Sequence, residues 1–127
     1  YDFSFSGLKT SVVNTVRKQP DATTADVAAS FRLAVVDVLV TRARRAAADV
    51  GATALCLAGG VAANSLLRRR VEEACEEDGI GAFVPSRALC TDNAAMVAAA
   101  GWWRLQHGGA SPLTLGADPN LALAAGG

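Results

Sequence analysis

Two adjacent glycines follow a short apolar run, and this pattern limits the fold of the chain more than any other. Residues 53–58 form that run, as expected for a strand covered on both faces. Gly59 and Gly60 come next, and Asn64 then stands where a helix cap is expected. A second apolar run, residues 80–84, follows that helix. Strands that alternate with helices of this length predict an α/β fold with parallel pairing and right-handed crossovers.

Apolar residues at helical spacing predict three helices. The residues are Leu8, Val12, Val13 and Val16; Val27, Phe31, Val35, Val38 and Leu39; and, on the buried side of the third helix, Leu67, Val71, Ala74 and Cys75. A fourth helix is expected to run through Met96 and Val97. Pro20 ends the first helix because proline cannot continue one. The last helix is expected to begin after a cap at Thr91 or Ser86 and to run to about Leu105.

Local signals also predict the ends of the long second helix and of the third. Thr23, followed three residues later by Asp26, is an acidic variant of the capping box. Gly51 and Gly79 are the expected stops of the second and third helices, because glycine adopts the left-handed conformation that ends many helices.

The first seven residues predict a third strand. Phe3 and Phe5 alternate with Ser4 and Ser6, a pattern typical of a strand with one buried face, and Gly7 closes it. The chain starts there without an initiator Met, so we expect a fragment of a longer protein.

The size and charge of the chain indicate one domain with no global attraction for nucleic acid. Its 127 residues are enough to bury a core, and its 12 basic and 12 acidic residues cancel. We place the domain at residues 1–107. Residues 108–127, rich in Gly, Ala and Pro, are expected to form a loosely ordered tail.

The cysteines and the absence of a long apolar run indicate a cytoplasmic protein with no membrane contact. Cys56, Cys75 and Cys90 are odd in number and show no CxxC spacing, which favours reduced thiols. No apolar run approaches the roughly 18 residues needed to cross a bilayer. The first residues also lack the order of a signal peptide.

Gly59 and Gly60 are candidate binding residues for a nucleotide. A phosphate or ribose can approach a glycine backbone without meeting a Cβ, and a helix N-terminus follows just downstream. Asn64 has an amide that suits the same ligand, although it is also a good helix cap. The pattern is neither GxGxxG nor a P-loop, so a tight strand-to-helix turn without a ligand remains an alternative.

Asp92 is a candidate metal ligand, because it lies in or beside the first turn of a helix, where the dipole favours a carboxylate. A single Asp does not make a metal site. The one histidine, His107, stands at the start of the tail and is expected to be a helix C-terminal residue.

Several further polar and aromatic residues have two interpretations each. Those near Gly7 either contact a polar ligand or form a wet strand face, and the arginines either contact RNA phosphates or lie on solvated helix faces. These residues are Ser4, Ser6, Lys9 and Thr10; Arg42, Arg44 and Arg45; and Arg68, Arg69 and Arg70. Of Trp102 and Trp103, we expect one to pack and the other to mark an interface.

Three motifs resemble one known family. They are FSFSGLKT at Phe3–Thr10, GGVAAN at Gly59–Asn64 with Leu67 and Arg68 after it, and CTDNAAM at Cys90–Met96. Their sequence and order are similar to the C-terminal part of the universal tRNA threonylcarbamoyladenosine transferases, formerly described as O-sialoglycoprotein endopeptidases. The resemblance covers residues 1 to about 105.

The resemblance implies an RNase H-like lobe of the actin and Hsp70-like ATPase superfamily. It also implies that Asn64, Gly59 and Gly60 bind the adenine nucleotide of threonylcarbamoyl-adenylate. Asp92 is then a ligand of an active-site iron or zinc ion, completed by two histidines of an HxxxH motif. The implied reaction moves the threonylcarbamoyl group to N6 of adenosine 37 in tRNAs that read ANN codons.

The implied partners are tRNA and, in bacteria, a paralogous actin-like protein and a P-loop ATPase. This chain departs from the family pattern because it has no HxxxH motif and no N-terminal lobe. We therefore expect the isolated chain to be inactive. Alternatives are a non-catalytic interaction module that self-associates, a metallopeptidase as the older name implies, and a small-molecule kinase of the same superfamily.

Overall fold

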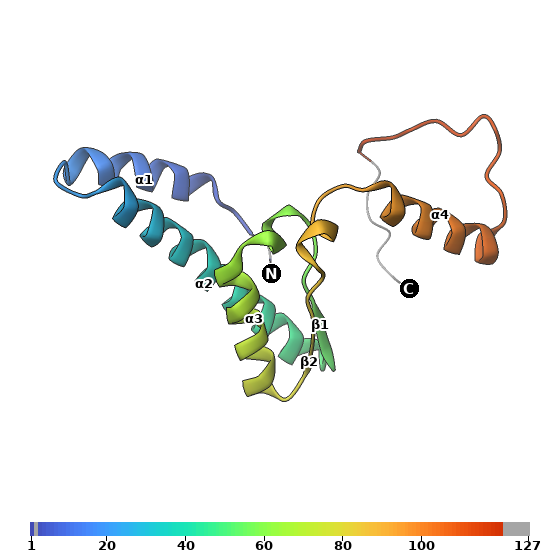
Figure 1. The fold of residues 1–127 in the computed structure, drawn as a ribbon, viewed down its shortest axis with the longest axis horizontal. Coiled ribbons are helices and arrows are strands. Elements are labelled where there is room, and N and C mark those ends of the chain that lie inside the picture. The colour runs from blue at the N-terminus through green and yellow to red at the C-terminus, as the bar shows by residue number, and fades with distance from the viewer. Residues whose placement is uncertain (2, 121–127) are drawn as a thin grey trace. The chain divides into compact units, whose positions relative to one another are not determined.

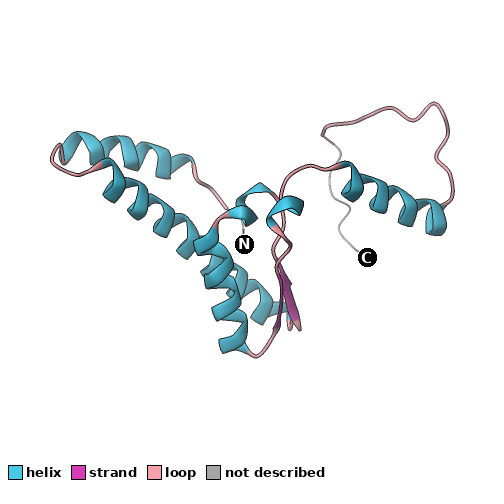
Figure 2. Cartoon of the chain, viewed as in Figure 1, coloured by secondary structure: helices cyan, strands magenta, loops and turns pink. Residues whose placement is uncertain are grey.

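The computed structural model describes residues 1 and 3–120 of the chain. In chain order the elements are α1 (Ser6–Lys18), α2 (Thr24–Val50), β1 (Ala54–Cys56), the 3₁₀ turn η1 (Gly60–Ala63), α3 (Ser65–Asp78), β2 (Gly81–Phe83), the 3₁₀ turn η2 (Arg87–Leu89) and α4 (Ala94–Gly108) (Figures 1 and 2). The chain forms two compact units, Tyr1–Asp92 and Asn93–Gly127, which are described separately. The division that the sequence predicts, after residue 107, remains a prediction.

The predicted parallel strands are confirmed in the first unit. Ala54 pairs with Gly81 and Cys56 with Phe83 in a two-stranded parallel sheet. The amide of Leu57 donates to the carbonyl of Phe83 at 2.9 Å, which extends the pairing by one bond. The expectation that the run is covered on both faces is wrong for Cys56, which is exposed, because α2 and α3 both lie on the face that Leu55 and Leu57 present (Figure 1).

The core of this unit forms where α2 and α3 pack against each other and against the strands. Leu67, Val71 and Cys75 follow one another at four-residue spacing on α3, and all are at most 3% exposed. Together with Val36 of α2 they form one buried cluster. The buried side predicted for this helix, including Ala74, is confirmed. Burial raises the pKa of the Cys75 thiol, so this side chain stays neutral in the core.

The apolar stripe predicted for α2 is only partly right. Val27, Val35 and Leu39 of this stripe are half-buried, but Phe31 and Val38 are 42% and 41% exposed. Val36, which the predicted stripe omits, is 1% exposed. The helix has 27 residues against 14 in α3, so its two halves meet different neighbours. The N-terminal half runs beside α1 and the C-terminal half beside α3 (Figure 1). A single stripe therefore does not describe the buried side of the whole helix.

The predicted caps of α2 and the predicted end of α3 are confirmed. The Thr23 hydroxyl accepts a hydrogen bond from the amide of Asp26 at 3.1 Å. Gly51 and Gly79 end α2 and α3 with φ of 64° and 67°. These three signals act within one turn of chain, which explains why the sequence alone predicts them.

The predicted cap of α4 is wrong. Neither Thr91 nor Ser86 caps this helix, because the Asn93 side chain does so and accepts from the amide of Met96 at 2.9 Å. Ser86 instead stands before η2.

The strand predicted at the N-terminus is also wrong. Phe3 and Phe5 lie outside regular structure, and α1 begins at Ser6 and includes Gly7. A strand needs a neighbour for its backbone bonds, and the sheet that the described residues form contains only β1 and β2. The two rings stack instead, with centroids 6.4 Å apart, and the guanidinium of Arg42 lies 5.8 Å from the Phe3 ring.

Ion pairs join the charged sides of α2 and α3. The Arg44 guanidinium binds Glu77 at 2.9 Å and also binds Asp78, whose pKa it lowers through the hydrogen bond between them. Arg70 lies 3.6 Å from Asp37. For Arg44 and Arg70 these contacts are consistent with solvated helix faces, and contact with RNA phosphates stays a prediction.

The second unit contains α4, which has no buried residue among those described. Trp102 and Trp103 are 65% and 60% exposed, so neither is buried as the prediction that one of them packs requires. His107 lies in the last turn, as predicted, and its Nδ1 is 2.8 Å from the carbonyl oxygen of Trp103. Across residues 1 and 3–120, no helix has the length and apolar character that a membrane crossing requires.

The packing around Val36 gives a test of this core. Val36→Ala removes two methyl groups from a filled site and should lower the free energy of unfolding by about 2 kcal/mol. Val38→Ala, two residues along the same helix, should change it by less than about 0.5 kcal/mol because the side chain is exposed. Urea titration measures both, and equal losses would contradict the assignment of the core.

Candidate functional site

The turn after β1 is the centre of the candidate site. Gly59 has φ 80°, and Gly60 opens the 3₁₀ turn η1. Ala62 within this turn is fully buried, and its amide donates to the carbonyl of Gly59 at 2.9 Å. The amide of Asn64 donates to the carbonyl of Val61 at 3.0 Å. The turn is therefore held from inside by its own backbone bonds and by one buried methyl group.

Both glycines leave the space above the turn open. A Cβ built on Gly59 or Gly60 meets no heavy atom within 4 Å. At Gly59 the positive φ independently requires glycine, whereas Gly60 has no such strain. The open space is consistent with the predicted approach of a ligand to this backbone.

Asn64 caps α3, as the sequence predicts. Its Oδ1 accepts hydrogen bonds from the amides of Leu66 at 3.0 Å and Leu67 at 3.2 Å. The cap uses the side-chain oxygen, and the Nδ2 donors are chemically distinct from it. The same residue can therefore cap the start of the helix and hold a ligand, and the ligand contact stays a prediction. The positive end of the α3 dipole lies directly after the glycine turn.

Arg68 joins the glycine turn to the segment after β2, a role that sequence reasoning missed. Its Nη1 donates to the carbonyl of Ala62 at 3.0 Å and its Nη2 to the carbonyl of Pro85 at 2.6 Å. Nη1 also lies 3.7 Å from Sγ of Cys90. The sequence does contain a signal for this role: Arg68 is a cation in the first turn of a helix, where the dipole disfavours it.

The neighbouring arginines make different contacts. Arg69 lies 3.7 Å from Glu73, and Arg70 lies near Glu73 and Asp37. Ser4 and Ser6 are exposed with their hydroxyls 3.2 Å apart, and Lys9 and Thr10 are exposed on α1. The structure thus brings Arg68, but not these other polar candidates, to the glycine turn.

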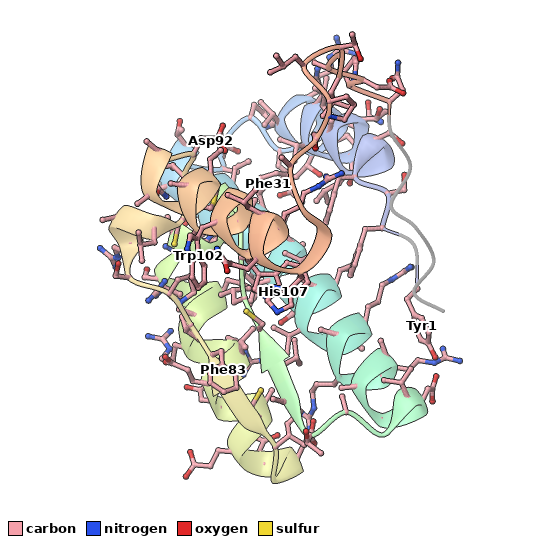
Figure 3. All side chains as sticks on the ribbon, turned by 90° about the vertical axis from the view of Figure 1, so that its right-hand side faces the viewer. Tyr1, Phe31, Phe83, Asp92, Trp102 and His107 are labelled. Carbon is pink, nitrogen blue, oxygen red and sulfur yellow. The ribbon has the colours of Figure 1, made fainter. Side chains whose placement is uncertain are left out.

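Asp92 is exposed and lies one residue before the cap of α4, not inside its first turn (Figure 3). Its segment follows β2, whose carboxyl end lies beside that of β1 in the parallel sheet. Among the residues that the structure describes, no three His, Cys, Asp or Glu side chains form a group that holds a metal ion. A metal ion at Asp92 would therefore need further ligands, because the described residues by themselves do not fit a complete metal centre.

The two glycines should respond differently to a methyl group. Gly59→Ala places an L side chain at φ 80° and should lower the free energy of unfolding by about 1–2 kcal/mol. Gly60→Ala meets open space and should leave it within about 0.5 kcal/mol. Thermal and urea unfolding measure both values. A loss at Gly60 as large as at Gly59 would contradict this geometry.

Comparison with known proteins identifies a family. The family model described as TsaD, tRNA N6-adenosine threonylcarbamoyltransferase, matches residues 1–99. A protein of that name from Thermotoga neapolitana is 48% identical over 123 residues, which are 97% of this chain and 38% of the relative. The Bacillus cereus protein of the same name is 51% identical over 130 residues, 98% of this chain and 38% of the relative.

A third relative of that name, from Salinibacter ruber, is 49% identical over 131 residues, 97% of this chain and 39% of the relative. The chain thus spans about two fifths of the length of these curated relatives. The resemblance carried by the three sequence motifs is confirmed. Because the family model covers residues 1–99 and the relatives match nearly the whole chain, the chain belongs to the tRNA N6-adenosine threonylcarbamoyltransferase family.

Proposed function

We propose that this chain supplies one wall of the nucleotide cleft in a tRNA threonylcarbamoyltransferase. The reaction transfers the threonylcarbamoyl group from threonylcarbamoyl-adenylate to N6 of adenosine 37 in tRNAs that read ANN codons. The lobe is RNase H-like, of the actin and Hsp70-like superfamily, and a second lobe closes the cleft. Because the chain spans about two fifths of the length of its curated relatives, we expect this segment alone to be inactive.

The open glycine turn at the start of α3 is the observation that carries this proposal. Gly59 and Gly60 expose backbone with no side chain above it, so a phosphate can approach closely. The first turn of α3 offers a positive dipole end at the same place. The capping bonds fix the side chain of Asn64, so its amide is already oriented and ligand binding loses less side-chain entropy. An adenylate has the phosphate and ribose groups that suit this arrangement.

Asp92 is the proposed contribution of this chain to an iron or zinc site. An ion held there would supply a positive charge that orients the threonylcarbamoyl group. Asp92 supplies one carboxylate ligand, and the histidines of an HxxxH motif in the other lobe supply the rest. The same proposal includes the partners, which are tRNA, an actin-like protein and a P-loop ATPase. It also includes a cytoplasmic location.

An interaction module is the second candidate, and exposed apolar residues on α4 favour it. Val97, Trp102, Trp103 and Leu105 are each more than half exposed in the structure. Such a surface is typical of association sites. Self-association of the purified chain without nucleotide binding would support this candidate over the transferase.

A chimera tests the transferase proposal. This chain replaces the matched segment of the Bacillus cereus relative, and threonylcarbamoyl transfer to tRNA is measured. We expect activity, and we expect Asn64→Ala to raise the Kd for the adenylate by about tenfold, as the loss of one ligand hydrogen bond does.

Asn64→Asp separates the cap from the ligand contact. Aspartate caps helices as well as asparagine does, so stability should be retained. It lacks the amide donors and adds a negative charge, so adenylate binding should fall as far as in Asn64→Ala or further. Full binding by the Asp variant would show that Asn64 acts only as a cap.

Asp92→Ala in the active chimera should lower the rate of transfer by at least about 100-fold, because metal sites tolerate the loss of a ligand poorly. Bound metal, measured by elemental analysis, should fall with it. Asp21→Ala, an exposed carboxylate before α2, is the control and should keep full activity. Full activity of the Asp92 variant would exclude the metal role.

A further inference from the structure

The contacts of Arg68 differ from those of the other arginines on α3. Arg69 and Arg70 lie near carboxylates, with side chains 66% and 49% exposed. Arg68 is half-buried, and its guanidinium donates to two backbone carbonyl oxygens. It is thus directed inward, toward the backbone of this unit.

The position of Arg68 is electrostatically unfavourable for the helix alone. It lies in the first turn of α3, and this turn contains no acidic residue. A cation there faces the positive end of the helix dipole. Partial burial of its charge adds a desolvation cost, which the two carbonyl bonds offset. The presence of Arg68 at this position is therefore explained by the two segments that it joins and not by the stability of α3.

Arg68 joins the two segments that leave the carboxyl ends of the parallel strands. Ala62 belongs to the turn after β1, and Pro85 follows β2 by two residues. In open α/β sheets, ligands bind outside these ends. Arg68 therefore holds together the two segments that border this edge of the sheet.

Cys90 makes a further contact between Arg68 and the segment after β2. It is 2% exposed, and its Sγ lies near Nη1 of Arg68 and donates to the carbonyl of Ser86 at 3.4 Å. The backbone over residues 85–90 is thereby folded onto the guanidinium. Asp92 follows Cys90 by two residues.

We propose that Arg68 is a positioning residue that holds the glycine turn in its nucleotide-binding geometry by clamping it to residues 85–90. It acts through the carbonyls of Ala62 and Pro85 and does not itself touch the nucleotide. This inference rests on the proposed function, because it assigns a role within the same site.

The first test measures the turn directly. In the Bacillus cereus chimera, hydrogen exchange of the segment 59–64 is followed by mass spectrometry for Arg68→Ala and for Arg69→Ala. Loss of the two charge-assisted bonds should speed exchange of this segment by about tenfold or more. Arg69→Ala should leave it unchanged. Unchanged exchange in the Arg68 variant would overturn the clamp whether or not the chimera is active.

The second test measures the consequence for catalysis. Arg68→Ala should raise KM for threonylcarbamoyl-adenylate about tenfold and change kcat by less than about threefold, because a positioning loss acts on binding of the nucleotide. Arg68→Lys should recover only part of this effect, since an ammonium lacks the planar fork that reaches two carbonyls. Millimolar guanidinium should restore KM in Arg68→Ala and have no effect on Arg69→Ala.

These outcomes separate the two proposals. An inactive unmodified chimera that binds no adenylate contradicts the proposed function. If the chimera is active and Arg68→Ala leaves KM unchanged, the positioning role is overturned. It is also overturned if Arg68→Ala lowers kcat and raises KM together with a lowered melting temperature, and guanidinium does not rescue either constant. A raised KM with guanidinium rescue supports it.

Discussion

The parallel pairing of β1 with β2 is the constraint on which the rest of the first unit depends. Parallel neighbours cannot be joined by a tight turn, so the chain must cross over, and α3 makes that crossing. The register of Ala54 with Gly81 places both carboxyl ends at one edge of the sheet. The segments that follow the two strands therefore begin side by side. Arg68 joins segments that the sheet has already brought together.

Strands of three residues form few hydrogen bonds, so the helices have to hold this pair in place. Leu55 and Leu57 pack against the buried cluster of Val36 and the apolar residues of α3. Each fully buried aliphatic side chain contributes about 1.5–3 kcal/mol. The exposed ion pairs between α2 and α3 contribute far less. The geometry of the glycine turn thus depends on apolar packing of α3, because α3 starts where the turn ends.

The sequence predicts the features of this fold that are decided within one turn of chain. The caps at Thr23 and Asn64 and the stop at Gly79 need only neighbouring residues, and all three are confirmed. The conformation of Phe3–Phe5 and the burial of Val36 depend on which elements lie nearby, and the spacing of apolar residues in the sequence does not supply that information. In the site, the glycine turn and the Asn64 cap were predictable. The cation near the start of α3 marks Arg68 as unusual, but its partners were not predictable, because its acceptors are backbone carbonyls, which every residue carries.

Two features of the site are unfavourable to the local structure that contains them. Gly59 requires a positive φ and hence glycine, which loses more backbone entropy on folding than other residues, and Arg68 puts a cation at the positive end of α3. Stability of α3 alone would favour an acidic residue in the first turn of this helix. Natural sequences break such local rules mainly where function requires it. Both departures lie at the start of α3 and both shape the open backbone before it, which is why the candidate site is placed there and not along the better-packed helices.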